Sequence, residues 1–464
     1  MPEDALISQL TERAIELVAK WEGSFHEYRA HPATAFDEKG FEASWAEFSR
    51  RMAGNYPFFH PSFAGQMLKP PHPVAVAGYL AALLVNPNNH ALDGGPVTSQ
   101  MEKEVVAALG EMLHLPAILG HLTSSGTIAN LEALFVARQL APGKQVVFGS
   151  NAHYTHKRMC QLLGIEAVEV GLDERGRIDL EAVARHCEGG KVGTVVLTAG
   201  STGRGLVDPI DQALQLKERY GVRLHVDAAY GGFFSLLAWE DASAGLVPAP
   251  AYRAIAGCDS VVVDPHKHGL QPYGCGAVLF SDPRVGILYR HDSPYTYFTS
   301  TDLHLGEISL ECSRAGAAAA ALWLTLRVLP LEAGQGLGPI LAACRRAALS
   351  FSERLAATDG FLLLEEPELD IVTYLPSAPE LSRRQLAEWS QAILREGMVA
   401  REPLYLSLLQ LGEREADRLG SLPAGEGETR VLRSVLMKPE HELYIDELVA
   451  RLASLREKTA PGKP

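Results

Sequence analysis

The feature that most constrains the fold is an alternation of two hydrophobic patterns between about residues 105 and 280. Short apolar runs rich in β-branched residues alternate there with stretches whose apolar residues recur at helical spacing. This alternation is typical of β-α-β units, so it predicts an α/β fold with a mainly parallel sheet covered by helices. The expected strands are Gln145–Phe148, Ala167–Val170, Thr194–Thr198, Arg223–Val226, Ser260–Val263 and Ala277–Phe280. The expected helices are Asn130–Leu140, Thr155–Leu163, Leu180–His186 and Asp211–Tyr220.

The segments on either side of this region have other patterns. Residues 1–75 start with helical spacing and continue into a stretch rich in proline, histidine and aromatic residues, which predicts a helical and extended arm that wraps a partner subunit. A glycine-rich run after Pro330 indicates a domain boundary. We therefore divide the chain into the arm (1–75), a large domain (76–335) and a smaller C-terminal α+β domain (336–464).

Composition restricts the ligands and the setting. Among 464 residues, 42 Lys and Arg stand against 56 Asp and Glu, and the net charge of -14 repels a nucleic-acid backbone. The most apolar stretch, Ala315–Leu326, is too short to span a bilayer and predicts a core helix. No export signal is visible, and six cysteines without a C-x-x-C pair argue against a disulfide framework or a thiolate metal site. We expect a cytoplasmic protein with a small-molecule ligand.

The most informative motif is Asp264-Pro265-His266-Lys267, which directly follows the expected strand Ser260–Val263. Ligands of open α/β sheets bind at the carboxyl ends of the strands. A lysine amine that is buried at such a position can attack an aldehyde and form an imine. Taken alone, the motif is equally consistent with an ordinary loop lysine.

A second motif places an aspartate at the end of another strand. Asp227 closes an apolar strand and is followed by Ala228 and Ala229, which are too small to block a flat ligand. A carboxylate there can pair with a protonated pyridine nitrogen and make the ring an electron sink. The ordinary alternative is a turn or helix-capping aspartate.

Three further turns carry polar groups after expected strands. Residues 123–127 are small and hydroxyl-rich and precede a helix, so their amides can bind a phosphate, although simple capping is as good an explanation. His153 can stack on a planar ring, and Ser201 adds a hydroxyl at another strand end. Each signal is modest, but together they provide a phosphate site, a ring stack, a pyridinium partner and an imine lysine.

These motifs resemble those of fold-type I pyridoxal-phosphate enzymes, and among them the group II decarboxylases that act on aromatic amino acids, glutamate and aspartate. The resemblance runs from roughly residue 55 to residue 330. It implies a transferase-like large domain with a mainly parallel, seven-stranded sheet, pyridoxal 5'-phosphate as the cofactor, and an amino-acid substrate. It also implies a homodimer whose active site is shared between subunits.

The resemblance implies a role for each motif. Lys267 is the Schiff-base lysine, Asp227 pairs with the pyridine nitrogen, and His266 lies near the phosphate. Ala229 touches the ring, and His153 stacks on it and assists the protonation steps. The other implied cofactor contacts are Ser125, Gly126, Thr127, Ser201 and Asp264.

Several positions leave the substrate and the proton donor open. His268 stands where aromatic decarboxylases carry tryptophan, which weakens an assignment to aromatic substrates. Tyr295 and Tyr297 both fit the catalytic tyrosine of the family's loop. Arg314 fits a contact with the phosphate or the substrate, and equally a structural ion pair. Plausible pocket residues are Gln66, Lys69 and His304.

The favoured reaction is decarboxylation of an L-amino acid to the corresponding amine and carbon dioxide through Lys267. A carbon-carbon lyase or an aminotransferase would use the same cofactor. A non-catalytic binder has little need for Lys267, Asp227 and His153 together. A nucleotide-binding Rossmann protein is disfavoured because no G-x-G-x-x-G motif follows the first strand.

Overall fold

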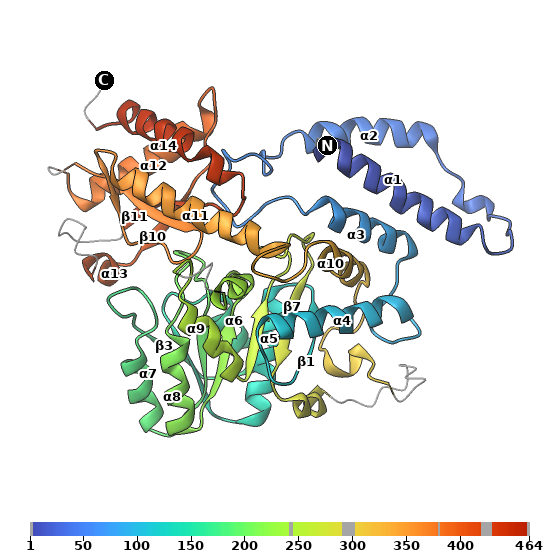
Figure 1. The fold of residues 1–464 in the computed structure, drawn as a ribbon, viewed down its shortest axis with the longest axis horizontal. Helices are drawn as coiled ribbons and strands as arrows, with labels where there is room; N and C mark the ends of the chain where they lie inside the picture. The colour runs from blue at the N-terminus through green and yellow to red at the C-terminus, as the bar shows by residue number, and fades with distance from the viewer. Residues whose placement is uncertain (1–2, 241–244, 290–301, 379–380, 419–428, 462–464) are drawn as a thin grey trace.

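The computed structural model describes residues 3–240, 245–289, 302–378, 381–418 and 429–461. Figure 1 shows a large sheet flanked by helices in the lower half of the view, a smaller sheet with its own helices above it, and the N-terminal helices extending to one side.

The large sheet has seven strands in the order β1-β7-β6-β5-β4-β2-β3. β7 pairs antiparallel with β1 and β6, and the other neighbours pair in parallel. The expected fold class and mainly parallel sheet are therefore confirmed. The central strands are buried on both faces, as their valine-rich sequences require. The strands are β1 (Leu119–Thr123), β2 (Gln145–Gly149), β3 (Ala167–Val170), β4 (Val192–Thr198), β5 (Arg223–Asp227), β6 (Ser260–Val263) and β7 (Gly276–Phe280).

Strand β1 was not among the expected strands. Its sequence contains Gly120 and His121, which interrupt the run of apolar residues by which a buried strand is recognised. Its pairing partner β7 also lies far along the chain. Helix α5 begins at Gly126, earlier than the expected Asn130, because the Ser125 hydroxyl caps it by accepting the Ile128 amide at 3.4 Å.

The helices of the large domain cover both faces of its sheet (Figure 1). Helix α10 includes most of the apolar stretch expected in the core, beginning two residues later than Ala315, and packs against α3 and α4. Within the described ranges, every helix is too short or too polar to cross a membrane. The α-helices are α4 (Pro96–Met112), α5 (Gly126–Leu140), α6 (Thr155–Leu163), α7 (Leu180–Glu188), α8 (Ile210–Tyr220), α9 (Ala249–Ala254) and α10 (Ala317–Val328). The 3-10 helices are η2 (Gly232–Ala238), η4 (Ile255–Gly257), η5 (Pro283–Tyr289) and η6 (Leu305–Ile308).

The N-terminal segment contains α1 (Glu3–Glu22), η1 (Pro32–Thr34) and α2 (Glu38–Met52), and α3 (Pro73–Val85) follows it. α1 packs on α3, whereas α2 has no buried residue. The stretch after α2 runs along the small domain, where the Ala64 amide donates to the Tyr405 carbonyl and the Val435 amide donates to the Ala64 carbonyl.

The small domain has an antiparallel sheet in the order β10-β11-β9-β8 and a hydrophobic core of its own. Arg204 of the large domain forms ion pairs with Glu365 and Glu415 of the small domain. The domain boundaries at 75 and 335 stay a prediction. The elements are α11 (Leu337–Ala356), β8 (Phe361–Leu363), β9 (Ile371–Pro376), α12 (Arg383–Val399), β10 (Ser407–Leu411), α13 (Glu413–Arg418), β11 (Thr429–Val435) and α14 (His441–Lys458).

Candidate active site

A cavity of about 240 Å³ lies where the parallel strands of the large sheet end and helix α5 begins. This position is the usual ligand site of an open α/β sheet. The residues expected from sequence that line the cavity are Ser125, Gly126, Thr127, His153, Asp227, Ala229, Asp264, His266 and Lys267.

Lys267 lies in the turn after β6, and its side chain is 20% exposed. Its Nζ lies 3.2 Å from Oδ2 of Asp264, and the backbone amide of Lys267 donates to the Asp264 carbonyl at 2.9 Å. His266 is fixed by a hydrogen bond from Nδ1 to the Cys275 carbonyl at 2.7 Å. The lysine amine is thus held at the cavity while remaining reachable from outside.

Asp227 ends β5, and only 6% of it is exposed. Oδ2 accepts hydrogen bonds from His156 Nε2 at 2.8 Å and Asn130 Nδ2 at 3.3 Å, and Oδ1 accepts the Ala229 amide at 3.1 Å. Burial raises the pKa of Asp227, but the hydrogen bond and charge of His156, together with the charge of Lys267, outweigh it and lower the pKa well below its usual value. The carboxylate is therefore ionised at neutral pH.

A chain of buried polar groups supports Asp227 from behind. His225 Nε2 donates to Asn130 Oδ1 at 2.8 Å, and His225 Nδ1 lies 2.9 Å from Ser260 Oγ. Burial lowers the pKa of His225 to about 3, so this ring is neutral and its Nδ1 accepts from the serine. Sequence reasoning missed His156, Asn130 and His225. The signal that could have found His156 is its position three residues after His153, in the first turn of α6.

The first turn of α5 forms one wall of the cavity. The first amides of a helix lack acceptors within the helix and carry the positive end of its dipole. The Thr127 hydroxyl lies beside that of Thr155, with 3.3 Å between the oxygens. A Cβ on Gly126 would come within 2.6 Å of Asp264 Oδ2, so only glycine allows the turn after β6 to approach the helix this closely.

His153 lies on the wall of the cavity. Its Nδ1 accepts the Thr155 amide at 3.3 Å, and its ring centre lies 4.2 Å from that of the exposed Tyr154. Burial, only partly opposed by Asp227, lowers the pKa of His153. In the neutral ring the proton is therefore on Nε2.

This set of groups fits pyridoxal 5'-phosphate. Lys267 provides an amine for the aldehyde, Asp227 an ionised carboxylate for the ring nitrogen, and the start of α5 a site for the phosphate. The buried Oδ1 of Asp264 also has no hydrogen-bond partner in the described part of the chain. An acceptor left open beside the lysine indicates a site built for a polar ligand.

Comparison with known proteins decides the family. Residues 57–375 match the pyridoxal-dependent decarboxylase conserved domain. The chain belongs to this family. The decarboxylase is 30% identical over 327 residues to the probable L-tyrosine/L-aspartate decarboxylase of Methanothermobacter thermautotrophicus, covering 70% of this chain and 85% of that protein. It is 28% identical over 346 residues to the probable L-aspartate decarboxylase of Pyrococcus furiosus, covering 73% and 89%.

Solved structures share the fold of this decarboxylase. Mouse CSAD superposes with a TM-score of 0.76 at 22% identity, covering 96% of this chain and 92% of that one. Oryza sativa TDC, solved with PLP and tryptamine, gives a TM-score of 0.76 at 18% identity and covers 97% of both chains. The expected family, fold and cofactor are confirmed, and the protein is a pyridoxal-phosphate-dependent amino-acid decarboxylase.

Some candidate residues of the decarboxylase lie away from the cavity. Ser201 is buried, but its hydroxyl accepts the Leu206 amide at 3.1 Å, and its neighbours Gly200 and Thr202 line the cavity instead. Tyr295 and Tyr297 lie outside the described residues.

Arg314 and the suggested pocket residues have structural partners. Arg314 Nη1 forms a buried ion pair with Glu102 at 2.6 Å and also donates to the Leu122 carbonyl. Of the two roles considered for Arg314, the structural ion pair is therefore the one observed. Lys69 Nζ donates to the Met437 carbonyl, and His304 Nδ1 accepts the Leu92 amide. Gln66 is exposed and is not among the residues that line the cavity.

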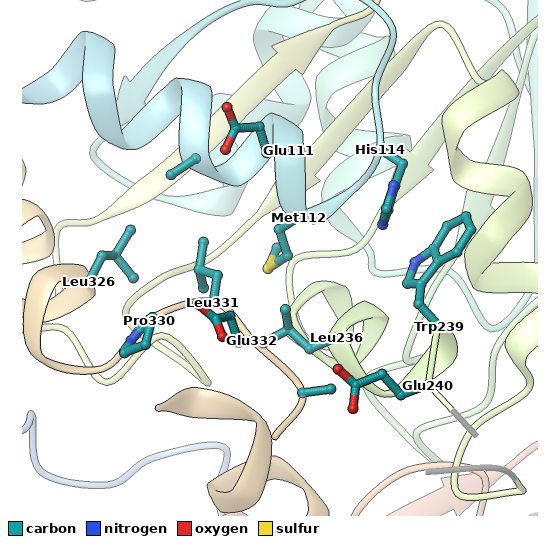
Figure 2. A pocket seen from close by; sticks show the side chains of 12 residues that line it. Glu111, Met112, His114, Leu236, Trp239, Glu240, Leu326, Pro330, Leu331 and Glu332 are labelled. Atoms are coloured by element: carbon teal, nitrogen blue, oxygen red, sulfur yellow. The ribbon is translucent and has the colours of Figure 1, made fainter. Parts of the chain in front are cut away.

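A second cavity, of about 480 Å³, lies between α4, η2 and the segment after α10. Figure 2 shows the carboxylates of Glu240 and Glu332 there, with the paired rings of His114 and Trp239 to one side. Its lining contains three glutamates and no lysine. It offers neither an amine for an aldehyde nor a favourable field for a phosphate, so the smaller cavity is the candidate active site of the decarboxylase.

Proposed function

We propose that Lys267 binds pyridoxal 5'-phosphate covalently and that Asp227 keeps its ring nitrogen protonated during decarboxylation of an L-amino acid. The observation that carries this proposal is that the amine and the ionised carboxylate face one cavity beside the first turn of α5. When bound, the cofactor supplies an aldehyde for amines and an electron-withdrawing ring that lets the α-carboxylate leave as carbon dioxide.

Each residue has a defined task in this proposal. Asp264 orients the Lys267 amine, and His156 and Asn130 hold the Asp227 carboxylate in one orientation. The amides of Gly126 and Thr127 bind the phosphate together with the hydroxyl of Ser125 or Thr127.

A flat side chain and a proton donor are also required. His153 lines the cavity and would lie against one face of the cofactor ring, and its Nε2 would deliver a proton to the substrate's α-carbon after the carboxylate has left. Tyr295 and Tyr297 are the alternative donors suggested by the sequence. Ala229 leaves room for the flat ring beside Asp227.

The substrate proposal follows from the relatives. Proteins named as L-tyrosine/L-aspartate and L-aspartate decarboxylases cover most of this chain, so we propose L-aspartate or L-tyrosine as the amino acid. The test is release of labelled carbon dioxide from a panel of carboxyl-labelled amino acids, with wild-type protein and Lys267→Ala. We expect release from one of these two substrates and none from the variant. Release by Lys267→Ala, or formation of an oxo acid without carbon dioxide, would contradict the proposal.

We further propose a cytoplasmic homodimer in which the N-terminal arm packs on the partner subunit. Large hydrophobic side chains of the arm are exposed, including Phe25 at 62%, Phe36 at 73% and Trp45 at 51%, and α1 and α2 extend away from the body of the protein (Figure 1). Such a surface is unusual for a monomer. Sedimentation should give twice the chain mass of 50.2 kDa, and Trp45→Glu should shift the protein towards one copy. A monomeric wild-type protein would contradict this.

A further inference from the structure

Three buried side chains form a closed hydrogen-bonded group directly behind the lysine turn. His268 Nε2 lies 2.8 Å from Asp370 Oδ2, and the Tyr230 hydroxyl donates to Asp370 Oδ1 at 2.6 Å. His268 Nδ1 lies 3.0 Å from the backbone carbonyl of Tyr230. The exposed fractions are 1% for His268, 0% for Asp370 and 3% for Tyr230.

The partners of His268 determine where its protons are. The Tyr230 carbonyl can only accept, so Nδ1 carries a hydrogen. Burial raises the pKa of Asp370, but the charge and hydrogen bond of His268 and the hydrogen bond of Tyr230 lower it more. The carboxylate is thus ionised and also accepts, so Nε2 carries a hydrogen too. His268 therefore donates one hydrogen bond to the Tyr230 carbonyl and one to the Asp370 carboxylate in the protein interior.

This group connects three parts of the chain that matter for the active site. His268 directly follows Lys267, and Tyr230 lies three residues after Asp227. Asp370 precedes β9 in the small domain, where its carbonyl accepts the Leu436 amide at 2.8 Å. The other groups whose charges interact with Asp370 or Tyr230 include Arg433, Lys69, Cys344, Arg345, Tyr252 and His441. One carboxylate from the small domain thus reaches both turns that carry the proposed chemistry.

We propose that His268 and Asp370 are a positioning pair through which the small domain sets the distance between Lys267 and Asp227. The inference rests on the roles proposed above for these two residues. A turn held only by its own backbone bonds allows the lysine amine to shift, and misplacement by about 1 Å can cost about 100-fold in rate. The pair removes this freedom because the two turns share one fixed carboxylate.

The central test compares Asp370→Asn and His268→Asn with wild-type holoenzyme. Asparagine keeps the size of Asp370 but removes the charge. We expect kcat to fall by about 10- to 100-fold in each variant while KM changes by less than about threefold, because substrate binding does not need the pair. We also expect pyridoxal 5'-phosphate to form its coloured complex with the apoprotein several-fold more slowly. Unchanged kcat and unchanged complex formation would overturn the proposal.

A matched control separates positioning from general stability. Tyr374 lies on β9 in the same domain, is buried, and is hydrogen-bonded to Ser434 at 2.9 Å, away from the cavity. Tyr374→Phe should lower the melting temperature without changing kcat or the rate of complex formation. If Tyr374→Phe changes kcat and the rate of complex formation as much as Asp370→Asn does, any destabilisation of the small domain has this effect. His268 and Asp370 then have no specific positioning role.

Two further variants keep the result interpretable. If Asp370→Asn does not fold, Tyr230→Phe removes one hydrogen bond from Asp370 and should give a smaller fall in kcat in the same direction. The double variant His268→Asn/Asp370→Asn should be no slower than the slower single variant, because both changes remove one interaction. If the falls in kcat of the two single variants multiply in the double variant, the two residues act independently and the pairing is wrong.

The outcomes also distinguish this proposal from the assignment of Lys267. If Lys267→Ala keeps activity, the proposed function fails. If Lys267→Ala is inactive while Asp370→Asn behaves as wild type, only the positioning pair fails. Nitrogen-15 spectra of the holoprotein, with His268 assigned by its loss in His268→Asn, should show a hydrogen on each ring nitrogen. A ring with one bare nitrogen would overturn the two hydrogen bonds assigned to His268.

Discussion

The two sheets of this decarboxylase contribute to the active site in different ways. The large sheet delivers functional groups directly, with Asp227 at the end of β5 and Lys267 in the turn after β6. The small domain places none of its described residues on the cavity wall, but its Asp370 and Arg433 bond to the turns that carry Lys267, Tyr230 and Thr202. We therefore propose that the strand ends of the large sheet supply the chemistry and that the small domain supplies the alignment.

The largest effect should come from the large sheet. Asp227→Asn keeps the shape of the side chain but removes the charge that would hold the ring nitrogen protonated. We expect kcat to fall by about 100- to 1000-fold, as for loss of one fixed electrostatic group in an active site. Steady-state kinetics of carbon dioxide release checks this. If kcat falls by less than about tenfold, Asp227 at the end of β5 has no major part in the chemistry, and the proposed difference between the two sheets is wrong.

The next effect should appear in stability and originate in the small sheet. Arg433 on β11 is 7% exposed and donates to the carbonyls of Thr202, Gly203 and Gly65. Arg433→Met removes these three hydrogen bonds, of which the one to Gly65 is buried, so we expect at least about 2 kcal/mol lower free energy of unfolding. Urea denaturation measures this loss. A loss of activity larger than that of Asp227→Asn would contradict the division of labour.

A third prediction concerns the approach of the lysine turn to α5. Alanine at Gly126 would bring a Cβ within 2.6 Å of Asp264 Oδ2 and displace the partner of Lys267. We expect cofactor binding to weaken by about tenfold, which corresponds to about 1.4 kcal/mol. Titration of the apoprotein with cofactor measures this. Gly189→Ala is the control, since its nearest neighbouring atom would lie at 3.6 Å; equal weakening in both variants would contradict the explanation.

The smallest effect concerns acid stability, to which both regions contribute. Burial lowers the pKa of His225 in the large sheet and of His441 in the small domain to about 3. Between that value and the usual 6.5 the unfolded chain binds more protons, so stability rises with pH and is lost as the pH falls below 6.5. Each group contributes at most about 1.4 kcal/mol per pH unit.

Substitution of His441 tests this contribution. His441→Gln should flatten the dependence of the free energy of unfolding on pH between 4 and 6, measured by denaturant titration. An unchanged slope would contradict the burial of a neutral ring. If the large and small domains unfold in separate transitions, only the transition of the small domain should lose its pH dependence in His441→Gln. This result would assign the effect to the small domain alone.

The contrast between the sheets also explains how far the sequence alone reaches. Asp227 and Lys267 lie at the ends of strands with clear apolar patterns. Ligands of open α/β sheets bind at the carboxyl ends of the strands, so the sequence alone predicts that the two residues lie at one edge of the sheet. Thr202 was missed beside Ser201 because the side-chain direction within a turn depends on backbone angles that the pattern does not encode.

Groups that act from a distance left weaker signals or none. Asn130 is a polar residue buried within a helix, and its role depends on the neighbouring strand that carries His225. Asp370 lies 143 residues beyond Asp227 and meets the lysine turn only because two domains pack together. Long-range contacts of this kind follow from tertiary packing and have no local sequence pattern.

The most direct test of the central claim is chemical trapping at the lysine. The holoprotein is reduced with borohydride, digested, and the cofactor-bearing peptide identified by mass spectrometry. The structure predicts that the label is on the peptide containing Lys267, where the amine lies beside Asp264 and faces the cavity that holds Asp227. A label on another lysine, or a stable coloured complex with no trapped peptide, would contradict the account.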